Sequence, residues 1–139
     1  ALHRGLAGRI ITRFEEKGLQ LVGLKLMQMS QELAAKHYAE HTERPFYPGL
    51  VKFMTASPLV AIALRGPGAV AIARNLMGAT FGTEADAGTI RGDFGCSKSY
   101  NLIHGSDSPE NAERELALFF PEGTCDWQPI SSDWLWDSE

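Results

Sequence analysis

Residues 58–64, PLVAIAL, form a continuous apolar run with the length of one β-strand. This run predicts a strand buried on both faces, because a strand with one solvated face alternates apolar and polar residues. Upstream, residues 19–27 (LQLVGLKLM) have Val22, Leu24 and Leu26 at alternate positions, which predicts that these three share one face of a second strand. The fold is therefore expected to contain a sheet.

Helical patterns surround these two strands. Leu6, Ile10 and Phe14 recur every four residues, which predicts an amphipathic helix over 5–17. Further helices are predicted over 31–41 with Ser30 as N-cap, over 47–55 and over 68–77. Residues 79–100 are rich in Gly, Thr, Asp and Ser and lack periodicity, which predicts a long loop of functional type.

The stretch 101–120, NLIHGSDSPENAERELALFF, is expected to add a short strand over 101–104 and a last helix. Ser108 and Pro109 suit the N-cap and first position of that helix. Its predicted apolar face consists of Ala112, Leu116, Phe119 and Phe120. With one strand placed before Ala1, the order becomes βαββαβ, an α+β ferredoxin-like sandwich, in a single domain spanning 1–139.

The composition narrows the function classes. The chain has 139 residues, 44% of them apolar and 22% charged, which is typical of a soluble globular domain. The formal net charge of −4 argues against nonspecific nucleic-acid binding, and no apolar run has the length of a membrane span. Cys96 and Cys125 match no zinc spacing and are expected to be free thiols in a reducing compartment.

His104 is the first candidate functional residue. A lone histidine at a strand end is more often structural than catalytic. As a nucleophile it would need one free ring nitrogen and a hydrogen-bond acceptor on the other. Glu115, at the margin of the buried helix face, is a candidate for that acceptor, although it could equally be a solvated carboxylate. Ser106 would supply a hydroxyl nearby.

The other histidines give little support for a metal site. His3, His37 and His41 offer no clear second ligand beside His104, so no metal ligand is predicted. His37 and His41 have i,i+4 spacing, but we expect His37 at the edge of the core and His41 near solvent.

A second group of residues suits a polyphosphate. Arg74 and Arg91 could supply bidentate donors, with the hydroxyl of Thr80 and glycine-rich backbone close by. The alternative is that both arginines are solvated. Phe46, before the predicted helix over 47–55, could stack on a base, or it could simply pack.

The run NLIHGSDSPENAERE resembles the active-site signature of the nucleoside diphosphate kinase family, Asn-x-x-His-Gly-Ser-Asp. The segments RGLAGRIITRFEEKG, HY (37–38), RPFYPGLVKFM, GPGAVAIARNLMGAT and GTIRGDF also resemble that family, in order. The resemblance spans residues 1–120, and the ending SSDWLWDSE is similar to the longer tail of eukaryotic-type members.

The resemblance implies a ping-pong transfer of the γ-phosphate of a nucleoside triphosphate through His104 to a nucleoside diphosphate. It implies that Glu115 orients His104, that Ser106 touches this pair, and that Tyr38 lies near the transferred phosphate. Phosphate binding would fall to Arg74, Thr80 and Arg91, ribose binding to Asn101, and base stacking to Phe46 with Leu50 beside it. Stacking with little readout of base edges would give low base selectivity.

The resemblance also implies Mg²⁺, held mainly by the nucleotide phosphates, and ATP, GTP and other nucleoside di- and triphosphates as partners. A cytoplasmic homo-oligomer is expected, a hexamer in preference to a tetramer, with no membrane or specific nucleic-acid partner.

The sequence departs from the family pattern in three places. The family begins with a strand ending in Lys-Pro-Asp-Gly, and we expect such a strand, with its lysine, to precede Ala1 in the working protein. Lys98 and Ser99 stand where Val-Gly is common near the base, so Lys98 either approaches the nucleotide or is solvated. Gly82 replaces a proline that supports subunit contacts. The alternative function is a catalytically weak nucleotide-binding or assembly subunit that lacks the lysine strand.

Overall fold

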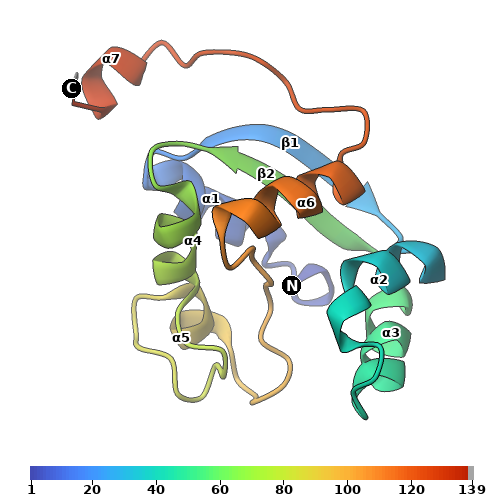
Figure 1. Ribbon diagram of the computed structural model, residues 1–139. Coiled ribbons are helices and arrows are strands. Elements are labelled where there is room, and N and C mark those ends of the chain that lie inside the picture. Colours follow the sequence, from blue (N-terminus) through green and yellow to red (C-terminus); the bar gives the residue numbers. More distant parts are fainter. Residues whose placement is uncertain (138–139) are drawn as a thin grey trace.

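The structure is a computed structural model that describes residues 1–137. Strands β1 (Gln20–Met27) and β2 (Leu59–Arg65) pair antiparallel as a two-stranded sheet with helices on both sides (Figure 1). The helices are α1 (Ala7–Glu16), α2 (Gln31–His37), α3 (Tyr47–Thr55), α4 (Ala69–Met77), α5 (Ile90–Phe94), α6 (Pro109–Phe119) and α7 (Ser132–Leu135), with 3-10 turns at Leu2–Arg4 and Ala39–His41.

The apolar run of β2 is covered on both faces, as its composition predicts. Ile62 and Leu64 pack into a cluster with Phe14 of α1 and Met77 of α4. The alternate residue Ala63 packs instead against Phe120, directly after α6. The sheet is therefore sandwiched between helices, which confirms the α+β class.

A bulge in β1 changes the environment of its side chains. The register with β2 shifts between Leu21 and Gly23, so Val22 has no cross-strand partner. Val22 is buried, whereas Leu24 and Leu26 beyond the bulge are 56% and 72% exposed. The prediction that these three side chains share one face is therefore wrong, because the extra residue reverses the alternation.

The helix predicted over 31–41 divides in two. Ser30 does cap it, since its side chain accepts a hydrogen bond from the amide of Leu33. The α-helix then ends at His37, and Tyr38 leaves helical geometry before the 3-10 turn at Ala39–His41. Tyr38 is buried beside Met29 and Ala34, so packing of this ring accompanies the break.

The loop predicted over 79–100 also contains a helix. Thr89 caps α5 by accepting a hydrogen bond from the amide of Gly92. The short helix buries Ile90 and Arg91. Its five residues lie below the length at which hydrophobic periodicity can be recognised in a sequence.

The strand predicted over 101–104 is wrong: within residues 1–137 this segment pairs with no strand. Leu102 has φ 72°, a left-handed conformation that no strand accommodates. The carbonyls of Asn101 and Ile103 instead accept hydrogen bonds from the guanidinium of Arg91. A buried side chain therefore takes the place of a strand partner for this segment.

The C-terminal tail runs back over the end of the sheet before α7 (Figure 1). The indole N–H of Trp127 donates to the carbonyl of Leu21 at 3.0 Å. Trp136 lies 3.5 to 3.6 Å from where side chains on Gly18 and Gly66 would begin, so it packs on these two turns. Within residues 1–137, no helix combines the length and the apolar character that crossing a membrane requires.

Candidate active site

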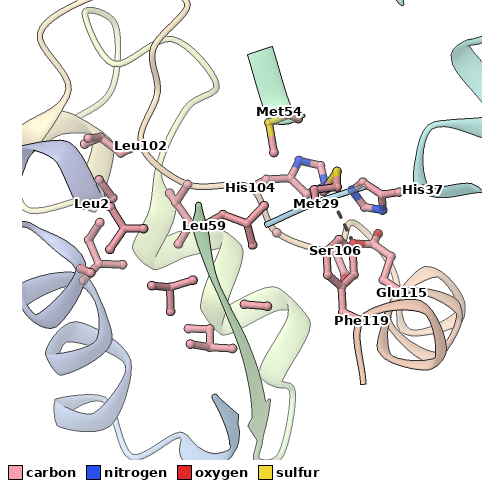
Figure 2. A pocket seen from close by; sticks show the side chains of 18 of the residues that line it. Leu2, Met29, His37, Met54, Leu59, Leu102, His104, Ser106, Glu115 and Phe119 are labelled. Atoms are coloured by element: carbon pink, nitrogen blue, oxygen red, sulfur yellow. Dashed lines mark ion pairs between the residues drawn. The ribbon is translucent and has the colours of Figure 1, made fainter. Parts of the chain in front are cut away.

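Two adjoining cavities meet at His104. An apolar cavity of about 320 Å³ lies between β2, α1 and the segment 102–106. Figure 2 shows it with His37, His104 and Glu115 at one end and Leu2 and Leu102 at the other. A polar cavity of about 280 Å³ lies beyond that end and shares these same two histidines and the carboxylate.

The backbone around His104 is fixed by Arg91. This arginine is 6% exposed, and its guanidinium donates to the carbonyls of Gly78 at 3.2 Å, Asn101 at 3.3 Å and Ile103 at 2.6 Å. These bonds join the end of α4 to the segment that carries His104. A guanidinium has five N–H donors, so some remain free to face the polar cavity, which Arg91 also lines.

Glu115 lies behind His104 on α6. The His104 Nε2 and Glu115 Oε2 atoms are 3.9 Å apart, an ion-pair separation that exceeds a hydrogen bond. The Glu115 side chain is 17% exposed, and that of His104 is 58% exposed at the mouth of the two cavities. Partial burial lowers the pKa of His104, and the Glu115 carboxylate only partly opposes this effect. A neutral imidazole is therefore favoured at neutral pH.

His37, from the end of α2, lies beside this pair, so the structure places a second imidazole next to His104 where the sequence offered no clear second ligand. The two imidazole rings are 5.4 Å apart at an interplanar angle of 87°. Arg114, one residue before Glu115, donates to the carbonyl of Lys36 at 2.5 Å and so ties the end of α2 to α6. The order of the histidines along the chain does not indicate this contact, because it depends on how the end of α2 packs against α6 and the segment 101–106.

The phosphate-binding candidates line one wall of the polar cavity. Arg74, Thr80 and Arg91 all contribute to that wall. Arg74 is exposed and donates to the carbonyl of Gly105 at 3.4 Å. Asn101 lies outside the lining, but its side-chain amide donates to the Thr80 carbonyl at 3.0 Å. The loop after α4 and the segment carrying His104 are thus joined here.

Tyr38 and Ser106 also lie close to His104. Tyr38 lines both cavities, and its pKa is raised to about 12 by burial and by the neighbouring Glu115. Ser106 lines the apolar cavity with His104 and Glu115. The phenol and the hydroxyl are therefore neutral donors at the edge of the site.

The base-binding candidates are not brought into either cavity. Phe46 is 54% exposed, and its ring lies 5.6 Å from that of His41. Leu50 packs instead with Met29 and Tyr38 in the core between α2 and α3. An exposed aromatic ring near the polar cavity keeps a stacking surface open to a ligand.

The polar cavity is lined by further residues that the sequence did not indicate as candidates. These lining residues include Glu40, His41, Asp107, Asn111 and Arg114. Asn111 and Glu115 are four residues apart on α6, so a helical projection of the last helix could have identified Asn111.

Acid is expected to destabilise the fold through His37. Burial, with smaller effects of His104 and Arg114, lowers its pKa to about 4, against about 6.5 in an unfolded chain. Between these two values the unfolded state binds more protons, so stability falls as the pH falls from 6.5 to 4. The urea midpoint should therefore drop between pH 7 and pH 5. His37→Gln should reduce this drop and the exposed control His3→Gln should not; equal drops in both variants would contradict the assignment.

Comparisons with known proteins identify the family. The family model described as nucleoside diphosphate kinase matches residues 1–125. A nucleoside diphosphate kinase of Synechococcus sp. (strain JA-3-3Ab) is 56% identical over 137 residues, which cover 98% of this chain and 92% of that protein. The chloroplastic nucleoside diphosphate kinase 2 of Pisum sativum is 52% identical over 135 residues, 96% of this chain and 59% of that protein.

Solved structures agree with the sequence relatives. The structure of a halophilic nucleoside diphosphate kinase from Halobacterium salinarum, in complex with CDP, has a TM-score of 0.93 and 47% identity, covering 98% of this chain and 91% of that one. That match extends over nearly the whole of this chain. The chain therefore belongs to the nucleoside diphosphate kinase family.

Proposed function

We propose that His104 carries the phosphoryl group in a ping-pong exchange between nucleoside triphosphates and nucleoside diphosphates. Membership of the family makes the chain a phosphotransferase of this type, and it disfavours the alternative of a weak binding or assembly subunit. The observation that carries the proposal is the position of His104, at a cavity lined by Arg74 and Arg91 with Glu115 behind it.

The chemistry follows from the two ring nitrogens. Nε2 faces Glu115, so a proton on this atom leaves the lone pair on Nδ1. Nδ1 attacks the γ-phosphorus, an N–P bond forms, and the bond from phosphorus to the β–γ bridging oxygen breaks. The nucleoside diphosphate leaves with that electron pair, and a second diphosphate attacks the phosphohistidine to reverse the step. Glu115 stabilises the positive charge that develops on the ring.

The cationic wall binds the phosphates. Arg74 and the free donors of Arg91 face the charge that accumulates on the transferred group, and Thr80 adds a hydroxyl. Tyr38, which lines both cavities, donates close to the reacting phosphate, and Ser106 supports the His104–Glu115 pair. Asn101 approaches the ribose 3′-hydroxyl from the same edge.

The base stacks on Phe46, with Leu50 beside it. The exposure of Phe46 supports this role, and stacking without base-edge contacts would give low base selectivity. Lys98 lies 4.9 Å over the ring of Phe81, which supports its placement away from the base.

Mg²⁺ fits the polar cavity as an ion carried in by the nucleotide. Mg²⁺ keeps several waters and takes few protein ligands when phosphates bind it. The exposed carboxylate of Asp107 lines the cavity and is the protein group that would approach the ion. When bound, the ion neutralises phosphate charge and orients the γ-phosphate.

The chain acts as one domain over 1–139 and assembles into a cytoplasmic homo-oligomer, a hexamer rather than a tetramer. Packing of Trp136 on Gly18 supports the single domain. Exposed Leu26 on β1 and Trp134 on α7, 72% and 90% exposed, support burial of these faces between subunits. Light scattering after gel filtration measures the number of subunits.

Labelling with γ-³²P-GTP tests the phosphohistidine. We expect one label per chain that is lost in acid, survives base, and moves to added nucleoside diphosphate. Label that survives acid, or that no diphosphate removes, would overturn the proposal.

Glu115→Gln is expected to slow phosphorylation of His104 while leaving assembly intact. The amide of glutamine still fills the space, but it is neutral and no longer stabilises the positive charge that develops on the imidazole. The rate of phosphorylation should therefore fall by roughly 10- to 100-fold. Rapid-quench measurement of the label gives this rate. Glu113→Gln, on the exposed face of α6, is the matched control. Equal rates in parent and Glu115→Gln would remove Glu115 from the mechanism.

A further inference from the structure

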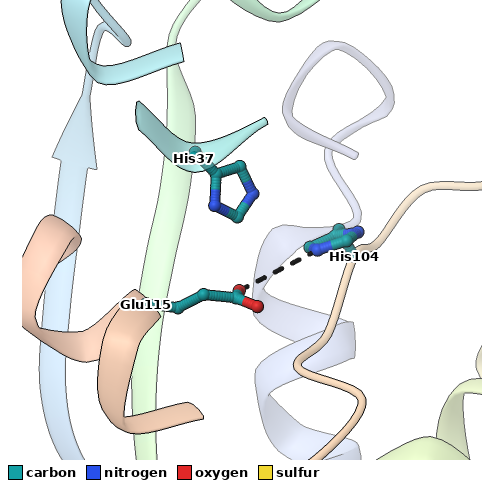
Figure 3. A group of neighbouring side chains, drawn as sticks. All are labelled: His37, His104 and Glu115. Atoms are coloured by element: carbon teal, nitrogen blue, oxygen red, sulfur yellow. Dashed lines mark ion pairs between the residues drawn. The ribbon is translucent and has the colours of Figure 1, made fainter. Parts of the chain in front are cut away.

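His37, His104 and Glu115 bring three metal-binding atoms together from α2, the segment 101–106 and α6. One nitrogen of each imidazole and one carboxylate oxygen lie within 4.8 Å of one another. Figure 3 shows the two rings and the carboxylate facing one another across a small gap. We infer that these three residues form a binding site for a divalent transition-metal ion such as Zn²⁺.

The distances suit an ion after a small closure of the side chains. Tetrahedral bonds of about 2.0–2.1 Å would place the ligand atoms roughly 3.3 Å apart, so atoms that now lie up to 4.8 Å apart must approach one another by up to about 1.5 Å. The His104 side chain is 58% exposed and can rotate into this position. The fourth position faces the cavities, where water or a phosphate oxygen can enter.

The donor set selects the kind of ion. Two imidazoles and one carboxylate match the ligands of zinc, copper and nickel sites, whereas Mg²⁺ prefers oxygen ligands only. The ring of His37 adds a second observation: its Nδ1 is buried and has no hydrogen-bond partner among the described residues. A buried ring nitrogen left without a partner costs free energy, and an ion bound at this nitrogen would supply the missing partner.

Metal binding and phosphorylation exclude each other, a consequence that rests on the proposed function. A neutral imidazole has one lone-pair nitrogen and one N–H nitrogen. If Nε2 of His104 binds the ion, the proton lies on Nδ1, which then has no lone pair for attack on phosphorus. The ion also occupies the Glu115 carboxylate that orients the ring. The metal-bound enzyme is therefore inactive until the ion leaves.

Titration of the nucleotide-free protein with Co²⁺ tests the site without reference to activity. We expect visible absorption of low-coordinate Co²⁺ at one ion per chain, displaced by Zn²⁺ and unaffected by excess Mg²⁺. His37→Leu should weaken binding by about 100-fold or more, because it removes a ligand, whereas His3→Leu should bind as the parent does. Unchanged binding in a folded His37→Leu variant, or no binding by the parent, would overturn the inference.

Spectra of ¹⁵N-histidine in the parent protein avoid any dependence on the folding of a variant. Zn²⁺ should shift the ring signals of His37 and His104 and leave those of His3 and His41 in place. Shifts confined to His3 or His41 would overturn the inference.

In the labelling assay, saturating Zn²⁺ should suppress the label on His104. If the titrations show metal binding but the protein takes up no label even without Zn²⁺, the metal site is supported and only the proposed function is contradicted.

Discussion

Replacing His104 with alanine is expected to abolish the phosphoenzyme and to lower kcat/KM by at least about 10⁴-fold, since no other group supplies the nucleophile. The substitution should leave the fold intact, because the side chain is 58% exposed and the backbone on either side is held by Arg91 and Arg74. A coupled assay of diphosphate phosphorylation and the ³²P label measure the two losses.

His3→Ala is the matched control for this variant, because His3 is exposed in the turn at Leu2–Arg4 and its side chain lines neither cavity. It should keep full activity and full label. The thermal midpoints of both variants should lie close to that of the parent. Acid-labile label retained by His104→Ala would place the phosphoryl group on another residue and contradict the assignment.

The sheet and its helices could be predicted because their signals are local. The run over 58–64 is apolar at every position, and the structure covers both of its faces. Ser30 and Ser108 each accept the amide hydrogen bond that an N-cap residue is expected to accept. Such features depend on a few neighbouring residues, which is the range over which periodicity and capping act.

The segment 101–104 could not be predicted because its conformation depends on a distant side chain. Its apolar residues favour a strand, but Leu102 adopts a positive φ, and Arg91 binds the carbonyls on either side. The bulge at Val22 has a similar origin. A side chain on Gly23 would begin 2.8 Å from the ring of Phe120, so contact with the end of α6 defines the strand there.

The resemblance identifies the positions of several candidate site residues. Residues that join the candidate site only through tertiary contacts could not be predicted. His104, Tyr38 and Arg74 do line the polar cavity. His37 could not be placed there, because its contact with His104 arises from the docking of α2 against α6, through Arg114. Sequence spacing alone carries no information about that docking.

Arg91 and Arg74 have the same expected role in the sequence but lie in different environments, one buried and one exposed. Arg91 is buried and donates to three carbonyls, so Arg91→Ala leaves these groups without partners and should cost about 3 kcal/mol or more of the free energy of unfolding. Arg91→Lys should recover little, because an ammonium group cannot donate in three fixed directions. Urea unfolding measures both losses.

Arg74 is exposed and makes a single long hydrogen bond, to Gly105, so Arg74→Ala should change stability by no more than about 0.5 kcal/mol. It should instead weaken phosphate binding and lower kcat/KM roughly 10- to 100-fold, the effect of losing one charged hydrogen bond. Arg91→Ala should lower both the free energy of unfolding and kcat/KM, because it removes the hydrogen bonds that hold the segment carrying His104 as well as the phosphate donors. Equal loss of stability in the two alanine variants would mean that Arg91 does not fix this segment, and the position of His104 would then need another cause.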